Sequence, residues 1–261
     1  GRMSVSIDGK TIIITGAASG IGRATAEVLH DMGTNVVLAD LHQKDLDEVL
    51  AELDLERSRI IGCSCDVTVA NDVDKLVAAA VEKFGKLNGL VNSAGVIMMD
   101  NAWDTSNEDM KQQFSVNVEG TFLCSRAVAL QFRANDGGSI VNVASNCGKV
   151  GYQNMAAYNA SKAAVISLTR SLSLEWSENN INVNAVCPGG VDTPMLANCA
   201  EWLGPRIGVE SAELLSSMVP AQLGRHIKPI EVAKIIAFLL SEDAIIIRGQ
   251  AINLDGGDTP Y

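Results

Sequence analysis

Three residues near the middle of the chain could move a proton to or from a substrate. Tyr158 and Lys162 are four residues apart, and Ser145 precedes Tyr158 by thirteen residues. Residues at i and i+4 share one face of a helix, so the ammonium would lie beside the phenol. Free tyrosine has a pKa near 10, and lowering it by about 3 units would require roughly 4 kcal/mol from a neighbouring cation. The same pair could also occupy a solvated helix face, so the rest of the chain must decide between the two.

A glycine-rich segment near the N-terminus could bind a phosphate. Thr15–Gly22 contains Gly16, Gly20 and Gly22 in a G-x-x-x-G-x-G spacing, between a predicted strand and a predicted helix. Glycines let backbone amides approach a phosphate, and the start of a helix offers free N–H groups and a positive dipole end. The spacing differs from the general dinucleotide fingerprint G-x-G-x-x-G. A tight strand-to-helix connection is therefore the alternative reading.

A carboxylate follows that segment at a fitting distance. Asp40 ends the second predicted strand, 18 residues after Gly22. A carboxylate about 20 residues beyond such a turn can bond the adenosine ribose hydroxyls of a dinucleotide. It would repel a 2′-phosphate, and neither Ser19 nor Leu41 is a cation that could receive one, so the pattern favours NAD over NADP. The alternative role of Asp40 is to cap the next helix.

Two further strand ends would lie on the same edge of the sheet. Asp66 could accept a hydrogen bond from an adenine amino group, and the small Ala94-Gly95 pair could leave room for ribose and phosphate. Taken alone, these are ordinary turn residues. The cofactor contacts predicted from the first four strand ends are Gly16, Ser19, Gly20, Ile21, Gly22, Asp40, Leu41, Cys65, Asp66, Val67, Asn92, Ala94 and Gly95.

The elements that must position these residues alternate between short β-branched runs and amphipathic stretches. That alternation is typical of a parallel sheet with crossover helices. The predicted strands are Thr11–Thr15, Asn35–Asp40, Arg59–Cys65, Leu87–Ser93, Ser139–Ser145, Ile181–Cys187 and Gln250–Leu254. The predicted helices are Ile21–Met32, Gln43–Leu53, Asp72–Phe84, Asn107–Phe132, Ala156–Ser177 and Ile230–Leu240. No linker or repeat divides the 261 residues. We therefore expect one α/β domain, doubly wound and Rossmann-like, with about seven strands, helices on both faces and ligands at the carboxyl ends of the strands.

Composition excludes several classes of partner. The net charge of −11 argues against electrostatic binding of nucleic acid. No apolar run reaches the length of a membrane span, and the N-terminus lacks a signal-peptide core. The six cysteines and three histidines show no zinc-like spacing, so no metal is expected. Reduced, packed thiols are the expected state of these cysteines, which predicts a cytoplasmic protein.

Together these motifs resemble the short-chain dehydrogenase/reductase family, in its single-domain form. The resemblance extends from Thr15 to Gly257, and its elements occur in order at fitting intervals. The residues that carry it are Thr15–Gly22, Asp66, Asn92–Gly95, Asn117, Ser145, Tyr158, Lys162 and Pro188–Thr193. Ser93 departs from the pattern, since the family more often has a second Asn there.

The resemblance implies a four-residue catalytic apparatus. Tyr158 would exchange the proton with the substrate oxygen as general acid/base. Lys162 would lower the pKa of Tyr158 and bond the nicotinamide ribose, and Ser145 would orient the substrate oxygen. Asn117 would hold a water that links Lys162 to solvent, or would only bond nearby backbone. The segment after the sixth strand would complete the cofactor site through Pro188, Gly189, Val191 and Thr193.

A substrate lid over residues 194–225 and a homotetramer are also implied by the resemblance. The lid could line the substrate site, or its apolar residues could simply form a small helical core; they are Met195, Leu196, Trp202, Leu203 and Met218. Cys147 would either face the substrate or be a buried thiol. Lys149 and Arg206 could reach the site and bind an anionic group.

The leading functional hypothesis is an NAD-dependent dehydrogenase of a small secondary alcohol or polyol, acting in either direction. A 3-oxoacyl thioester reductase of fatty-acid synthesis is the alternative within the family, but Asp40 and the acidic charge speak against it. A protein that binds NAD as a sensor and has no catalytic activity is the alternative outside the enzymes. The intact Ser145, Tyr158 and Lys162 set argues against that role.

Overall fold

A single parallel sheet of seven strands organises the chain. The computed structural model describes residues 5–53 and 57–261. The strand order is β3-β2-β1-β4-β5-β6-β7, and every neighbouring pair is parallel. The strands are β1 (Thr11–Thr15), β2 (Asn35–Asp40), β3 (Ile60–Ser64), β4 (Gly89–Asn92), β5 (Gly138–Val143), β6 (Ile181–Pro188) and β7 (Ala251–Leu254). The chain order reverses between β1 and β4, which is the switch point of a doubly wound sheet.

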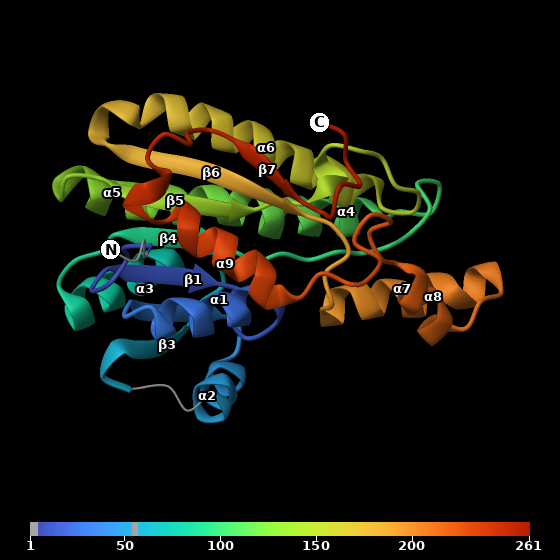
Figure 1. The fold of residues 1–261 in the computed structure, drawn as a ribbon, viewed down its shortest axis with the longest axis horizontal. Helices are drawn as coiled ribbons and strands as arrows, with labels where there is room; N and C mark the ends of the chain where they lie inside the picture. The colour runs from blue at the N-terminus through green and yellow to red at the C-terminus, as the bar shows by residue number, and fades with distance from the viewer. Residues whose placement is uncertain (1–4, 54–56) are drawn as a thin grey trace.

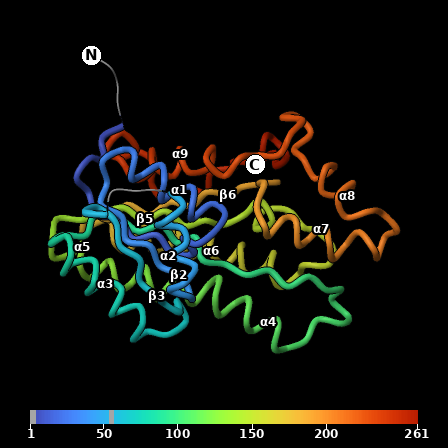
Figure 2. The backbone as a smooth tube through the Cα atoms, turned by 90° about the horizontal axis from the view of Figure 1, so that it is seen from below, coloured from blue at the N-terminus to red at the C-terminus, as the bar shows by residue number. Residues whose placement is uncertain are grey.

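Helices cover both faces of this sheet (Figures 1 and 2). The main helices are α1 (Gly20–Asp31), α2 (Gln43–Glu52), α3 (Ala70–Phe84), α4 (Asn107–Phe114), α5 (Thr121–Ala134), α6 (Ala156–Glu175), α7 (Pro194–Ile207), α8 (Ser211–Ser217) and α9 (Pro229–Leu239). Helices α1, α2 and α9 contribute to one apolar core, with Leu29, Leu46 and Ile236 fully buried. Helices α3, α5 and α6 contribute to the other, around Leu76, Phe132 and Leu172. The predicted single Rossmann-like domain is confirmed.

The central strands are apolar on both sides because both faces are covered. Every residue of β1 and of β6 is buried. Burial on both faces favours apolar residues throughout a strand, yet β6 carries the buried polar residues Asn182 and Asn184. The polar side chains inside must therefore bond one another. Asn92 on β4 donates to Ser125 Oγ at 3.0 Å and to Asn142 Oδ1 at 2.8 Å, and Asn142 donates to Thr169 Oγ1 at 3.0 Å.

The predicted helix Asn107–Phe132 is not a uniform α-helix. Helix α4 gives way to a π-helical segment, η2 (Ser115–Gly120), which passes directly into α5. An inserted π turn changes which residues face the sheet, and such insertions are frequent at functional sites. Asn117, one of the predicted catalytic residues, lies within this segment and is 1 % exposed.

Beyond the sheet, the segment 194–225, expected to be a substrate lid, contains one long helix and one short helix. Helix α7 begins at Pro194, and the Thr193 hydroxyl caps it by accepting from Leu196 N at 3.4 Å. Figure 1 shows α7 and α8 projecting past the end of the sheet. None of the helices in the described ranges is long and apolar enough to span a membrane.

Candidate active site

A cavity of about 960 Å³ lies at the carboxyl ends of the strands. Residues just after β1, β2, β4, β5 and β6 line it, together with residues of α6 and α7. In a parallel sheet these strand ends all meet at one edge, which explains why segments far apart in the sequence share one cavity. The predicted cofactor and catalytic residues can therefore act on the same ligands.

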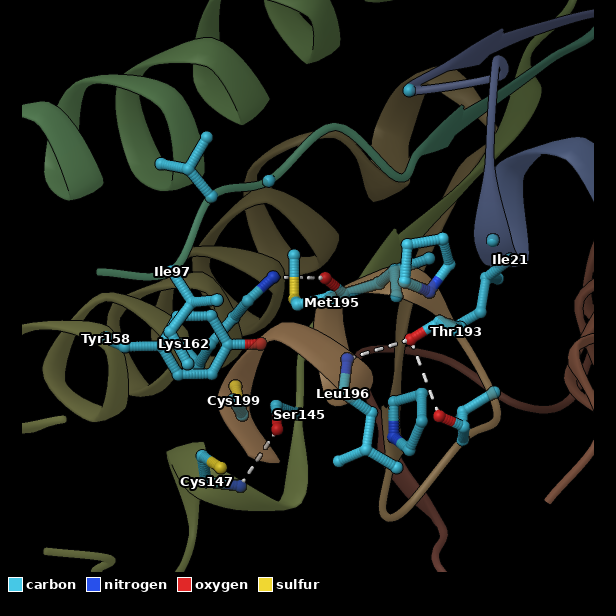
Figure 3. A pocket seen from close by; sticks show the side chains of 18 of the residues that line it. Ile21, Ile97, Ser145, Cys147, Tyr158, Lys162, Thr193, Met195, Leu196 and Cys199 are labelled. Atoms are coloured by element: carbon cyan, nitrogen blue, oxygen red, sulfur yellow. Dashed lines mark hydrogen bonds between the residues drawn. The ribbon is translucent and has the colours of Figure 1, made fainter. Parts of the chain in front are cut away.

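Tyr158 and Lys162 lie on the buried face of α6. Their relative exposures are 7 % and 6 %, so the pair does not occupy a solvated helix face. Lys162 Nζ lies 5.6 Å from the centroid of the Tyr158 ring and donates to the Val143 carbonyl at 3.0 Å. Figure 3 shows the phenolic oxygen of Tyr158 pointing into the cavity, on the side where Ser145, Cys199 and Leu196 lie.

Ser145 is held beside this pair by the turn that follows β5. It is the N-cap of a short 3-10 turn, η3 (Asn146–Gly148), and its Oγ accepts from Cys147 N at 3.1 Å. That bond fixes the side-chain rotamer and leaves the hydroxyl proton free to be donated. A hydroxyl placed this way can bond a substrate oxygen that Tyr158 also reaches.

Burial governs the ionisation of the site. Burial raises the pKa of the Tyr158 phenol above its ordinary value, and the Ser145 hydroxyl opposes that rise in part. Burial also lowers the pKa of the Lys162 ammonium to about 8. The direction for Tyr158 is opposite to the shift that the sequence predicts. Burial disfavours the charged phenolate, and this effect exceeds that of the hydrogen bond with Ser145. Tyr158 therefore holds its proton at neutral pH, the state of a proton donor.

Asn117 links the loop after β4 to helix α6. Its Oδ1 accepts from Val96 N at 2.8 Å, and its Nδ2 donates to Val96 O at 2.9 Å and to Ser161 Oγ at 3.0 Å. The alternative role considered above, bonds to nearby backbone, is thus the one that the structure contains. The side-chain oxygen of Asn117 keeps a second lone pair that can accept another hydrogen bond. The water expected to link Lys162 to solvent stays a prediction.

The glycine-rich turn is built for close backbone approach. Gly16 has a φ of 61°, and a Cβ there would lie 2.7 Å from Ala94 N. A Cβ on Gly22 would lie 2.2 Å from the Gly16 carbonyl oxygen. Larger residues would push the loop apart, so these two glycines set its shape. The turn is more than a tight connection, because its far side lines the cavity through Gly16, Ser19 and Gly20.

Two helices begin at this part of the cavity. Helix α1 starts at Gly20 and α7 at Pro194. A Cβ on Gly20 would lie 3.5 Å from Thr193 Cγ2, so the two starts face each other closely. Both positive dipole ends would attract a diphosphate placed there.

Asp40 lines the same cavity at the end of β2. Its Oδ2 accepts from Ala18 N at 2.9 Å and its Oδ1 from Leu41 N at 2.8 Å. The carboxylate thus bonds the glycine-rich turn, and it does not cap α2, whose N-cap is His42. Among the described residues that line the cavity, Lys162 is the only basic one.

Comparison with known proteins agrees with this geometry. Residues 10–204 match the model of the short chain dehydrogenase family. The chain is 36 % identical to an NAD-dependent glycerol dehydrogenase of Listeria innocua serovar 6a, over 97 % of this chain and 95 % of that protein. The chain belongs to the short-chain dehydrogenase family. It is accordingly an oxidoreductase whose fold binds a nicotinamide cofactor.

Solved structures of short-chain dehydrogenases superpose on nearly the whole chain. A levodione reductase has a TM-score of 0.89 and 31 % identity, covering 97 % of this chain and 98 % of its own. An actinorhodin polyketide ketoreductase with NADPH has a TM-score of 0.92 and 33 % identity, covering 99 % of this chain and 100 % of its own. The family therefore includes members with NAD and with NADPH, and the choice rests on this chain's own residues.

Most predicted site residues of this short-chain dehydrogenase meet in the cavity. Those that line it are Gly16, Ser19, Gly20, Ile21, Asp40, Leu41, Cys65, Asp66, Val67, Ala94, Gly95, Ser145, Tyr158, Lys162, Pro188, Gly189, Val191 and Thr193. Gly22, Asn92 and Asn117 lie behind the lining. Gly22 packs α1 against the turn, Asn92 belongs to the buried amide network, and Asn117 supports the loop at Val96.

The residues expected at the substrate end divide in the same way. Met195, Leu196, Leu203, Met218 and Cys147 line the cavity. Trp202 does not, because its ring stacks on the Arg206 guanidinium at 3.9 Å. Lys149 does not either, since its Nζ donates to Ala251 O at 2.8 Å.

Several lining residues were missed by sequence reasoning. Ile97 and Met99 come from the irregular loop after β4, and Asp258 comes from the turn after β7. The Asp255-Gly256-Gly257 run directly after the last predicted strand was the available signal, because the end of that strand lies on the ligand edge. The loop after β4 carried no comparable signal, since its path depends on the Asn117 bonds.

Proposed function

We propose that this short-chain dehydrogenase uses NAD to transfer a hydride between nicotinamide and a secondary alcohol or polyol, or the corresponding ketone. The observation that carries the proposal is the common cavity: Tyr158, Lys162 and Ser145 line one part of it, and Asp40 with the glycine-rich turn line another. A dinucleotide lying along the strand ends would bring its nicotinamide to the Tyr158 end.

The cofactor fits the residues present. The glycine-rich turn and the start of α1 would hold the diphosphate, and Asp40 would accept from the adenosine ribose hydroxyls. Val191 and Thr193 would hold the carboxamide end. When bound, the nicotinamide supplies the hydride acceptor or donor.

The chain's own groups handle the proton. In ketone reduction, Tyr158 would donate its phenolic proton to the substrate oxygen while the Ser145 hydroxyl holds that oxygen by a hydrogen bond. In alcohol oxidation the proton returns to Tyr158. Lys162, charged below its pKa of about 8, would stabilise the phenolate that reduction leaves behind.

NAD is favoured over NADP by charge. The Asp40 carboxylate would face a 2′-phosphate, and the cavity's described lining offers no cation near it. The same features weigh against an NADPH-dependent 3-oxoacyl thioester reductase. A homotetramer and a cytoplasmic location remain predictions, the latter based on free thiols.

The test is the Tyr158→Phe variant, compared with Tyr261→Phe. Loss of the phenolic hydroxyl should lower kcat by at least about 100-fold, because a positioned acid/base contributes that much. Tyr261 lies outside the cavity lining and its variant should retain turnover. NADH absorbance during alcohol oxidation measures both. Near-normal turnover by Tyr158→Phe would show that Tyr158 is not the general acid/base. NAD binding without turnover in the wild type would favour a sensing protein.

A further inference from the structure

The part of the cavity around the reacting groups is apolar, and this bears on the substrate if the proposed function is right. Ile97, Met195, Leu196 and Cys199 surround the end where Tyr158 projects (Figure 3). Cys199 is 8 % exposed, and burial raises the pKa of its thiol to about 11, so it is neutral at physiological pH. None of these four side chains is a strong hydrogen-bonding group.

The lid continues this apolar surface. Leu203 on α7 and Met218 after α8 also line the cavity. If Leu203 and Met218 formed only a small helical core, their side chains would point away from the cavity. Long thioether and isobutyl groups present only hydrocarbon and weakly polar sulfur to a ligand.

Polar lining side chains on this side lie mostly at the exposed rim. Gln112, Gln153 and Asp258 are all exposed. Tyr152 is 44 % exposed, and its hydroxyl accepts from Asn146 Nδ2 at 3.1 Å. These groups can meet a ligand's distal end or water. Of the other polar lining residues on this side, Asn154 is half-buried, Asn146 donates its Nδ2 to Tyr152, and Ser145 serves the reaction.

The charged residues at the substrate end of the cavity also disfavour an anionic substrate. Lys149 and Arg206, the two cations expected to reach the substrate, are occupied outside the lining. Asp258 stands at the rim, with its Oδ1 accepting from Ala221 N at 3.2 Å. A carboxylate or phosphate on the substrate would meet this acid and find no free cation among the described lining residues except Lys162, which serves the reaction.

These terms separate substrate classes by large factors. Each methylene moved from water into such a lining improves binding by about fourfold. Each hydroxyl buried there without a partner weakens binding by about fivefold to 150-fold. A polyol carries hydroxyls on the carbons that flank the reacting carbon, so its binding would be weakened by burying them without partners. A cyclic or branched alcohol carries methylenes there, so its binding would be strengthened.

We propose that the substrate is an uncharged secondary alcohol or ketone whose reacting carbon is flanked by apolar groups, such as a ring. Polyols, hydroxy acids and phosphorylated alcohols are the competing classes. This narrows the proposed function to its secondary-alcohol arm and assigns Ile97, Met195, Leu196, Cys199 and Leu203 as specificity-determining contacts.

The experiment compares kcat/KM with NAD for cyclohexanol and 4-methylcyclohexanol against glycerol, erythritol and 3-hydroxybutyrate. The cyclic alcohols should exceed each of the others by at least about 100-fold, by the factors above. A higher value for glycerol, erythritol or 3-hydroxybutyrate would overturn the inference and leave the proposed function standing.

A pair of lid variants tests the lining directly. Leu203→Asn should lower the cyclohexanol-to-glycerol ratio of kcat/KM by about tenfold, because it puts an amide into the apolar wall. Glu201→Gln, on an exposed position of the same helix and outside the lining, should leave the ratio unchanged. NADH binding, followed by fluorescence, should be the same in both variants. An unchanged ratio in Leu203→Asn with normal NADH binding would contradict the assignment.

A binding measurement separates failure of this inference from failure of the proposed function. Calorimetric titration of cyclohexanone and of dihydroxyacetone into the enzyme with saturating NADH needs no turnover. Saturable binding of cyclohexanone alone, without oxidation of NADH, would support the apolar class and overturn the oxidoreductase proposal. Binding of neither ketone, with no turnover of any alcohol, would overturn both.

Discussion

At the scale of single residues, burial decides what the Tyr158–Lys162 pair can do. Both side chains lie almost wholly out of water, and the two pKa shifts have the same cause but opposite directions. An acid buried in a low-dielectric site resists losing its proton, and a base resists gaining one. Burial therefore biases both groups towards their uncharged forms.

Lys162 gives the protein a pH-dependent term in stability. Its pKa falls from 10.5 to about 8 on folding, so between these values the unfolded chain binds more protons. The free energy of unfolding therefore rises as pH increases from about 8 to 10.5, and this residue contributes up to about 3 kcal/mol to the rise. The contribution is lost again as pH falls through 8. Urea unfolding of the wild type and Lys162→Met in parallel measures it. A difference between the two that stays flat over this range would contradict the shift.

Asp40 should decide the cofactor. Replacing it by Ser removes the negative charge that would face a 2′-phosphate, and we expect the NADP-to-NAD ratio of kcat/KM to rise by about tenfold or more. Asp45→Asn is the control, because it removes an equal charge from an exposed position on α2 outside the cavity lining. If the cofactor ratio of the Asp40 variant matched that of the control, the ribose role would be wrong.

At the scale of elements, helix α1 can approach the glycine-rich turn only because position 22 has no side chain. The helix start, the turn and the loop after β4 pack through backbone atoms at Gly16, Gly22 and Ala94. The π-helical segment η2 positions the loop near the catalytic residues, because it turns Asn117 towards Val96 and Ser161.

Gly22→Ala should therefore damage both stability and cofactor binding. The added Cβ would lie 2.2 Å from the Gly16 carbonyl oxygen, which must move. Overpacking of this kind costs about 1–3 kcal/mol, so the melting temperature should drop by roughly 2–12 °C. Gly151→Ala is matched in chemistry, and its Cβ meets nothing within 4 Å, so it should change neither property. Thermal melts and NAD titrations of both variants provide the comparison.

At the scale of the whole molecule, two long helices each expose a leucine to solvent. Leu130 on α5 is 58 % exposed and Leu174 on α6 is 79 % exposed. Large exposed apolar side chains on neighbouring elements are common at protein interfaces. They are consistent with the homotetramer that the family resemblance implies.

Light scattering should therefore give the mass of a homotetramer of the 27.6 kDa chain. Leu174→Glu should lower that mass, because a buried unpaired charge opposes association. Lys86→Glu, which introduces a negative charge at another exposed position, should not. A monomer mass for the wild type would overturn the prediction.

The sequence by itself determined the fold class, the approximate strand ends, and the glycines and polar residues that follow several of those strands. Those features follow from local periodicity, glycine positions and the rule that parallel strands share one carboxyl edge, all of which short-range spacing records. Asp40, the glycine-rich turn and the Tyr158–Lys162 pair are apparent from residue type and spacing alone.

The tertiary structure decided where side chains point and what surrounds them. Asn92 turned into the amide network, Asn117 into backbone bonds, and Trp202 onto Arg206, although each had a plausible place at the site. The direction of the Tyr158 pKa shift was likewise set by burial. Packing from several distant segments fixes rotamers, helix phase and dielectric surroundings, and no local spacing contains that information.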